Sequence, residues 1–295
     1  MSIKDIIRLM RPAQWVKNIF VLLPLFLSGR VCYPDASVNA IIACLLFSLT
    51  SSAIYCINDA VDAPYDALNP HKCNRPVASG AISPRSAFGI SFLLLAAVTV
   101  VLFISDSVNI RSLWIPLSCY LILNLGYSFF LKRIIVIDVL LIASFFILRI
   151  WAGAIAAGVY LTCWTIFLVA LLALMLAVGK RRYELRLALK KNIVSRANLR
   201  HYSLKFLDWF AIIVGITSVI VYILWSVSPY SQEHYHNDTL IYTSLFVILG
   251  IFRYLWLLIK DNKGGSPTAI LLHDRIIQAI ILLWTLTVGY IIYSV

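Results

Sequence analysis

Three aspartates and an asparagine lie within one short run, Asn58 to Asp66, of a very apolar chain. On a helix that turns about 100° per residue, Asp59, Asp62 and Asp66 project within about 20 to 60° of one another. Carboxylates on one face repel unless a cation lies among them, and such oxygen ligands suit Mg²⁺ that bridges to substrate phosphates. The run predicts a metal site of Asn58, Asp59, Asp62 and Asp66, whose aspartates are also catalytic. A solvated helix end with chance acidic residues is the alternative.

A basic loop follows the acidic run. Lys72 and Arg75 lie among prolines and a glycine that turn the chain back towards the next apolar segment. Lysine and arginine beside carboxylates would form a charge-balanced cradle for a polyphosphate, because a guanidinium can bind its oxygens in a bidentate manner. We therefore predict that Lys72 and Arg75 bind substrate. In the alternative interpretation, both are ordinary basic residues of a cytoplasmic loop.

Other candidate substrate-binding residues lie near the ends of apolar segments. Gln14, Lys17 and Asn18 are predicted to share one helical face at the start of the first segment, beside Trp15 as an interfacial anchor. That face would contact a phosphate group. The remaining candidates of this kind are Tyr127, Lys132, Lys180 and Arg181.

Two charged residues lie inside one predicted span. Asp138 and Arg149 are eleven residues apart, so they share a helical face but stand about 16 Å apart along the axis and cannot pair. Intramembrane charges usually face a bundle interior or a wet cavity. Asp138, near the cytoplasmic end, is predicted to be catalytic. Arg149 lies deeper and is predicted either to be structural or to contact a lipid phosphate.

The composition excludes a soluble globular protein. Of the 295 residues, 61% are hydrophobic and 13% are charged, and the mean hydropathy is +0.90. Apolar stretches of membrane-spanning length recur along the chain, which predicts an all-α, polytopic membrane protein with a single domain over residues 1–295. The nine predicted spans are 18–29, 37–57, 86–105, 111–131, 134–158, 161–179, 206–228, 239–259 and 269–294.

The net charge of +12 reports membrane topology rather than nucleic-acid binding. Basic residues gather in alternate loops, and only Arg30 and Arg111 fall in loops on the other side. This positive-inside asymmetry predicts a cytoplasmic N-terminus, an external C-terminus and a cytoplasmic active site. No nucleic-acid partner is expected.

The acidic run after the second of nine spans resembles the motif of the UbiA superfamily of intramembrane transferases. Most members move a prenyl group from its diphosphate and carry a second aspartate-rich motif after the sixth span, where this chain has a basic run, Gly179 to Glu184. That departure resembles one branch of the superfamily, the decaprenyl-phosphate phosphoribosyltransferases. Further segments that carry the resemblance are Arg11 to Asn18, Asn58 to Asp66, Pro70 to Pro76, Tyr127 to Lys132, Asp138 to Arg149, Arg253-Tyr254 and Asp274-Arg275.

The resemblance implies a fold, a reaction and partners. The fold would be nine transmembrane helices in a UbiA-like bundle around a cytoplasm-facing cavity, in the inner membrane. The reaction would be Mg²⁺-dependent transfer of 5-phosphoribose from 5-phosphoribosyl diphosphate to a polyprenyl phosphate (deca- or undecaprenyl), with release of pyrophosphate. The product would feed synthesis of cell-envelope pentofuranose donors, and a homo-oligomer is expected. Two alternatives stay open: a prenyltransferase that acts on an aromatic or other acceptor, and a lipid transporter.

Overall fold

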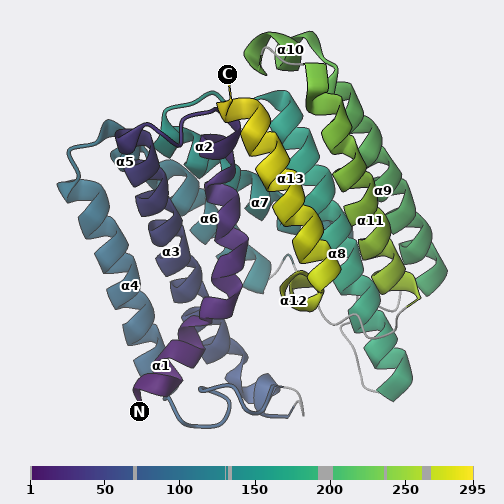
Figure 1. The fold of residues 1–295 in the computed structure, drawn as a ribbon. Helices are drawn as coiled ribbons and strands as arrows, with labels where there is room; N and C mark the ends of the chain where they lie inside the picture. The colour runs from purple at the N-terminus through teal and green to yellow at the C-terminus, as the bar shows by residue number, and fades with distance from the viewer. Residues whose placement is uncertain are drawn as a thin grey trace. The chain divides into compact units, whose positions relative to one another are not determined.

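All regular elements of the part of the chain that the structure describes are helical. The structure is a computed structural model, and it describes residues 2–68, 72–129, 131, 135–191, 202–235, 238–260 and 267–294. The chain forms two compact units (Figure 1). Unit 1 comprises residues 1–129 and 148–161, and unit 2 comprises residues 130–147 and 162–295. The prediction of a single domain over residues 1–295 treats both units as one functional whole, and it stays a prediction.

Unit 1 begins with three short helices, and longer helices follow. They are α1 (Ile3–Met10), the 3₁₀-helix η1 (Pro12–Val21), α2 (Leu23–Leu27), α3 (Pro34–Ala67), α4 (Pro84–Ile104), α5 (Val108–Ser112) and α6 (Trp114–Phe129). The helix α7 (Ile135–Ala157) contributes its second half to unit 1 and its first half to unit 2.

Unit 2 continues with further long helices and short connecting ones. They are α8 (Cys163–Lys191), α9 (Leu204–Ser226), α10 (Pro229–Tyr235), the 3₁₀-helix η4 (Asp238–Thr243), α11 (Ser244–Ile259), α12 (Pro267–His273) and α13 (Arg275–Tyr293). Within this unit, α8 packs along α9, and α11 packs on α9 and α13. An apolar core from α7, α8, α9, α11 and α13 joins them.

Eight helical segments of the described residues are long and apolar enough to cross a membrane. They match eight of the nine predicted spans, so the prediction of a multi-pass all-α protein is confirmed. The predicted span over residues 18–29 is wrong in its form, because this stretch is divided between η1 and the five-residue α2. Pro24 explains the division: proline has no backbone N–H, and its ring clashes with the carbonyl group of a preceding helical turn.

The longest helix, α3, carries the acidic run. Its 34 residues correspond to about 51 Å at 1.5 Å per residue, which exceeds the roughly 30 Å hydrocarbon thickness of a bilayer. The acidic residues therefore occupy the C-terminal end of a continuous helix. Buried hydroxyl groups in its middle donate to carbonyl groups one turn earlier, as Thr50 does to Leu46 at 2.8 Å and Ser51 to Phe47 at 2.8 Å. These bonds satisfy polar groups that have no access to water.

A glycine allows η1 to pack closely on α7. A Cβ atom added to Gly153 would lie 1.9 Å from the carbonyl oxygen of Val21 and 3.2 Å from the ring of Pro24. The first contact is with backbone, which cannot rotate away. Only glycine fits at this crossing, so Gly153 positions the N-terminal segment that precedes α3.

We predict that Gly153→Ala destabilises the protein by about 2 kcal/mol or more, because the new methyl group must displace η1. Thermal unfolding in detergent micelles, followed by intrinsic fluorescence, measures the change. The matched control is Gly89→Ala in α4, where a Cβ atom meets nothing within 4 Å. Equal unfolding temperatures for both variants would contradict the close contact.

Candidate functional site

Two buried aspartates at the end of α3 are paired with three cations. Arg75 Nη1 lies 3.2 Å from Asp59 Oδ1 and 2.5 Å from Asp66 Oδ2, so it bridges the two carboxylates. Arg11 forms a second ion pair with Asp59, and Lys72 Nζ lies 3.3 Å from Asp66 Oδ1. The aspartate side chains are only 1% and 4% exposed. Asp59, Asp66, Arg11, Lys72 and Arg75 are called the carboxylate cluster below.

Local structure brings the basic partners to α3. Arg11 lies between α1 and η1 with a left-handed backbone φ of 53°, which lets the chain turn there. Arg8 donates to the carbonyl oxygen of Asn74 at 3.3 Å and so ties α1 to the loop that holds Lys72 and Arg75. An apolar core of Leu9, Cys56, Ala60, Val77, Ile82 and Ala87 lies between these segments. Distant parts of the sequence thus converge on one helix end.

One acceptor in the cluster is unused. Asp59 Oδ2 is buried and accepts no hydrogen bond from any residue that the structure describes. A buried carboxylate oxygen without a donor is unusual and indicates a missing partner. The neighbouring Asn58 accepts a hydrogen bond from Ser128 Oγ at 2.7 Å, and Asp62 lies one turn from Asp59 on the same helix.

These donors fit a magnesium ion by their chemistry, since Asp59, Asp62, Asp66 and Asn58 offer hard oxygen atoms. Among the described residues, no group of three His, Cys, Asp or Glu side chains converges around one point. The carboxylates of Asp59 and Asp66 face cations instead. The metal ligands therefore remain a prediction, which requires Arg11, Lys72 and Arg75 to turn from carboxylate to phosphate when a metal–diphosphate binds.

Arg149 lies in a polar network inside unit 1. Its Nε donates to Asn18 Oδ1 at 2.8 Å, and its Nη2 donates to the hydroxyl group of Tyr120 at 2.9 Å. Its guanidinium carbon also lies 5.1 Å and 4.9 Å from the ring centroids of Phe47 and Tyr120. Asn18 in turn donates to Ser48 Oγ at 2.8 Å. Arg149 is therefore held rigidly by α3, α6 and η1.

The predicted shared face of Gln14, Lys17 and Asn18 is wrong. This segment is a 3₁₀-helix, which has three residues per turn, so Gln14 and Lys17 stay aligned while Asn18 falls on the face of Trp15. Trp15 donates to Ser52 Oγ at 3.0 Å, so both Trp15 and Asn18 face α3. Gln14 and Lys17 are half-buried. Their contact with a substrate stays a prediction.

Asp138 and Arg181 form a buried ion pair in unit 2. Arg181 Nε lies 2.9 Å from Asp138 Oδ2, and both side chains are at most 2% exposed. Arg181 also pairs with Glu184, whose side chain is 26% exposed, so Glu184 is not an isolated acid among cations. Arg181 Nη2 is buried and donates to no acceptor in the described parts of the chain. Lys180 and Tyr127 are half-buried, and Lys132 lies outside the described residues.

Sequence reasoning missed several partners. Arg11, Tyr120 and Ser128 were not predicted to be site residues, yet they contact Asp59, Arg149 and Asn58 respectively. Arg11 and Ser128 lie within two segments that carry the family resemblance, Arg11 to Asn18 and Tyr127 to Lys132. Their place in these segments was the sequence signal that could have identified them. Asp138 and Arg149 bind different partners, as their spacing predicts, and their roles at a site stay predictions.

Another ion pair connects α11 with the start of α13. Arg253 Nη2 lies 2.8 Å from Asp274 Oδ2, and this hydrogen bond holds the pKa of Asp274 below its usual value. Asp274 also caps α13 by accepting from the backbone N–H of Ile277 at 2.9 Å. These contacts give Asp274 a structural role, because it joins α11 to α13 and caps the start of α13.

Comparison with known proteins identifies the family. A model of the UbiA prenyltransferase family matches residues 19–293. The chain belongs to this family. It is 31% identical to a decaprenyl-phosphate phosphoribosyltransferase of Mycolicibacterium smegmatis, over 99% of this chain and 93% of that one. It is also 30% identical to a protein of the same name from Corynebacterium glutamicum, over 97% of this chain and 86% of that one.

Solved structures show the same fold. A UbiA homolog from Archaeoglobus fulgidus, solved with DMAPP and Mg²⁺, superposes with a TM-score of 0.69 at 19% identity and covers 99% of both chains. A structure on the biosynthesis of digeranylgeranylglyceryl phosphate synthase gives a TM-score of 0.64 at 18% identity, over 99% of both chains. The predicted UbiA-like fold is therefore confirmed, and the chain is a multi-pass membrane protein of this family.

A second glycine marks a close contact beside Arg181. A Cβ atom on Gly179 in α8 would lie 2.1 Å from the hydroxyl oxygen of Tyr254 in α11 and 3.3 Å from its ring. The Tyr254 hydroxyl group is buried and has no hydrogen-bond partner in the described residues. Gly179 is thus required by packing at the start of the basic run.

We predict that Gly179→Ala lowers the free energy of unfolding by about 2 kcal/mol and that Tyr254→Phe restores most of it in the double variant. The Phe side chain removes the atom that clashes, and it leaves no lost hydrogen bond. Thermal unfolding of the two single variants and the double variant checks this. Additive effects without rescue would refute the contact.

We also predict different roles for the two acids that pair with Arg181. Asp138→Ala should cost about 3 kcal/mol of stability because it leaves a buried arginine without its buried partner, whereas Glu184→Ala should cost about 1 kcal/mol or less. Urea or thermal unfolding in micelles distinguishes them. If Asp138→Ala is as stable as the parent protein, the pair is not a structural element.

Proposed function

We propose that this protein transfers 5-phosphoribose from 5-phosphoribosyl diphosphate to a polyprenyl phosphate and releases pyrophosphate, with Mg²⁺ as cofactor. One observation supports this above the others: Asp59 and Asp66 are buried at a helix end and form ion pairs with Arg11, Lys72 and Arg75. Such a cluster can exchange its internal ion pairs for a metal–diphosphate without a large change in net charge. Near-full-length similarity to proteins named decaprenyl-phosphate phosphoribosyltransferase supports the choice of sugar donor and of lipid acceptor.

The acids at the end of α3 and two of the neighbouring cations have separate roles in this mechanism. Asp59, Asp62 and Asp66, assisted by Asn58, would hold Mg²⁺, which supplies positive charge against the leaving pyrophosphate. Arg75 and Lys72 donate to the oxygens of the same pyrophosphate and stabilise the charge that develops as it leaves.

The acceptor is already an anion, so no general base is needed. The lipid phosphate oxygen attacks the anomeric carbon from the side opposite to pyrophosphate, and the C–O bond to the leaving group breaks with inversion at that carbon. Lys17, Lys132 and Lys180 are the candidates for holding the 5-phosphate group, and Gln14 and Tyr127 for orienting the sugar or the lipid head. Catalysis then depends on positioning and electrostatics in a shielded site.

The basic run favours a phosphoribosyl donor over a prenyl diphosphate donor. Arg181 and Arg182 are buried in α8, where the resemblance places a second acidic motif in most family members. Arg182 is anchored structurally, since it pairs with Asp208 and donates to the carbonyl oxygen of Leu258. Arg181 keeps one buried N–H group without a described acceptor. A second metal site is not supported by these cations.

The location we propose is the cell (inner) membrane, with the N-terminus and the carboxylate cluster on the cytoplasmic side. The cluster lies at the C-terminal end of α3, the same end at which the basic loop with Lys72 and Arg75 joins α4. The positive-inside rule supports a cytoplasmic position for that loop. The soluble donor would then reach the site from the cytoplasm. A homo-oligomer remains part of the proposal.

We predict that Asp62→Asn and Asp66→Asn each lower transfer at least about 100-fold, since each removes a metal ligand from the leaving-group site. The assay is thin-layer chromatography of lipids made from labelled phosphoribosyl diphosphate, Mg²⁺ and polyprenyl phosphates by the purified protein. The matched control is Asp35→Asn, which changes an exposed aspartate in the first turn of the same helix. Asp35→Asn should keep full activity.

The same assay distinguishes the other functions. Incorporation of label only from a prenyl diphosphate would indicate a prenyltransferase, and movement of label across vesicles without a new lipid would indicate a transporter. Full Mg²⁺-dependent activity in both Asp62→Asn and Asp66→Asn would overturn the proposed metal site, even if the product is the expected one.

A further inference from the structure

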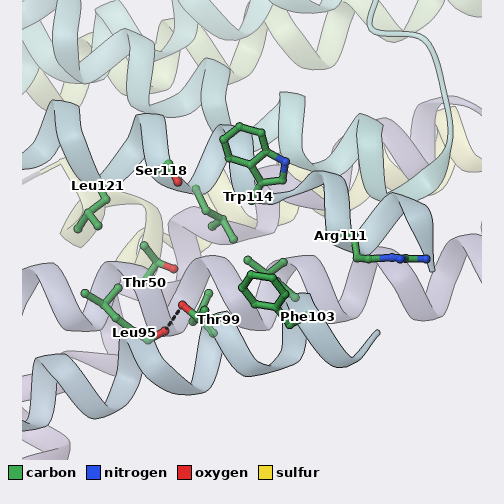
Figure 2. A pocket seen from close by; sticks show the side chains of 11 residues that line it. Thr50, Leu95, Thr99, Phe103, Arg111, Trp114, Ser118 and Leu121 are labelled. Carbon is green, nitrogen blue, oxygen red and sulfur yellow. Dashed lines mark hydrogen bonds between the residues drawn. The ribbon is translucent and has the colours of Figure 1, made fainter. Parts of the chain in front are cut away.

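An apolar groove lies between α3, α4 and α6, at a distance along the helices from the carboxylate cluster. Its volume is about 370 Å³, within the roughly 300–1,000 Å³ range of ligand sites. Thr50, Thr99 and Ser118 contribute small side chains from the three helices, and these leave room between larger apolar residues (Figure 2). The larger lining residues are Leu95, Val98, Leu102, Phe103, Trp114, Leu117 and Leu121.

The walls of the groove offer little hydrogen bonding. The Thr50 hydroxyl group donates to the carbonyl oxygen of Leu46 at 2.8 Å, and the Thr99 hydroxyl group donates to that of Leu95 at 2.9 Å. Both hydroxyl groups are therefore satisfied within their own helices. The groove thus suits a hydrocarbon chain better than a sugar or a nucleotide.

The groove opens on a face that meets lipid. The helix α4 buries little of its surface in the protein, and Phe103 at its end is 81% exposed. From Leu95 to Phe103 the helix rises about 12 Å, and one leaflet of a bilayer has about 15 Å of hydrocarbon. The groove accordingly spans nearly one leaflet, from the middle of the membrane to the end of α4.

A cation lies at the outer end of the groove. Arg111 projects away from Thr50, Leu95 and Leu121, which line the opposite end (Figure 2). Its Nη2 donates to the carbonyl oxygen of Asp106 at 3.2 Å, and a guanidinium carries five N–H groups, so donors remain for a ligand. The nearby indole of Trp114 is 60% exposed, as is typical at a membrane interface.

Arg111 stands at the end of the helices where basic residues are rare. Arg30 and Arg111 are the two basic residues that the predicted topology assigns to that side, and Arg111 lies in the short helix α5. Arg30 donates to the carbonyl oxygens of Ala157 and Gly158 at the end of α7. The positive-inside rule therefore does not explain Arg111. In the described part of the chain, its guanidinium group donates to a backbone carbonyl oxygen and not to a carboxylate.

We propose that this groove binds one phospholipid of the leaflet opposite to the carboxylate cluster. The phosphodiester accepts hydrogen bonds from Arg111, and one acyl chain fills the space between α3, α4 and α6. Three features together fit this occupant: an apolar groove of nearly one-leaflet length, threonine hydroxyl groups that bond within their own helices, and a cation at the membrane interface. A bound lipid would hold α4 against α3 and α6 at this end.

The test uses phosphatidylglycerol with a diazirine in one acyl chain, incorporated into nanodiscs with the full-length protein. After illumination, peptide mass spectrometry locates the label. We expect labelling of α4 and α6 at the groove. Thr99→Phe fills the groove and Arg111→Gln removes the cation, so each should lower this labelling about tenfold. Ser118→Leu is a second groove-filling variant, should Thr99→Phe not fold.

Two control variants match these changes elsewhere. Thr285→Phe makes the same substitution on α13, where the Thr285 hydroxyl group donates to the carbonyl oxygen of Ile281. Arg85→Gln removes an exposed cation at the other end of α4. Both should keep the labelling of α4 and α6. Unchanged labelling in the folded groove variants and Arg111→Gln would overturn the proposal. So would preferential labelling of the groove by a diazirine-bearing polyprenyl phosphate, because the groove would then hold the acceptor chain.

Discussion

The burial of two carboxylates at one end of α3 constrains the rest of unit 1. Moving a charge out of water costs several kcal/mol unless a partner of opposite charge lies beside it. Asp59 and Asp66 therefore require Arg11 and Arg75, which come from segments on either side of α3 in the sequence. The left-handed turn at Arg11 and the hydrogen bond from Arg8 to the carbonyl oxygen of Asn74 help to bring these segments to the end of α3. Folding thus assembles these ion pairs from segments that are distant in the sequence.

The same helix also organises the polar interior farther from the cluster. Ser48 binds Asn18, and Asn18 together with Tyr120 holds Arg149 in place. In a membrane, each such group must find its partner within the protein. Because α3 supplies partners along most of its length, it is the scaffold on which the N-terminal segment and α6 are positioned. The spans α4 and α13 bury much less of their surface than α3 does.

The sequence was sufficient to predict the family, the spans and the acidic helix end, because these depend on local periodicity, composition and motif. The 3₁₀ form of residues 12–21 could not be predicted, since no local periodicity marks it and its contacts with Gly153 and α3 come from distant parts of the sequence. The partners of Arg149 and Arg181 were also out of reach. Each partner lies on another helix or one turn away, and spacing alone does not reveal which side chains meet. Arg181 was predicted to bind substrate from its position alone, and its buried ion pair with Asp138 emerges only in the structure.

The central claim is that the carboxylate cluster exchanges its internal ion pairs for a divalent metal and a diphosphate. Electron paramagnetic resonance of Mn²⁺ titrated into purified protein, with and without pyrophosphate, tests it most directly. We expect Mn²⁺ binding that strengthens with pyrophosphate, is lost in Asp59→Asn, and persists in Asp35→Asn. Binding that is equal in all three proteins, or indifferent to pyrophosphate, would contradict the account.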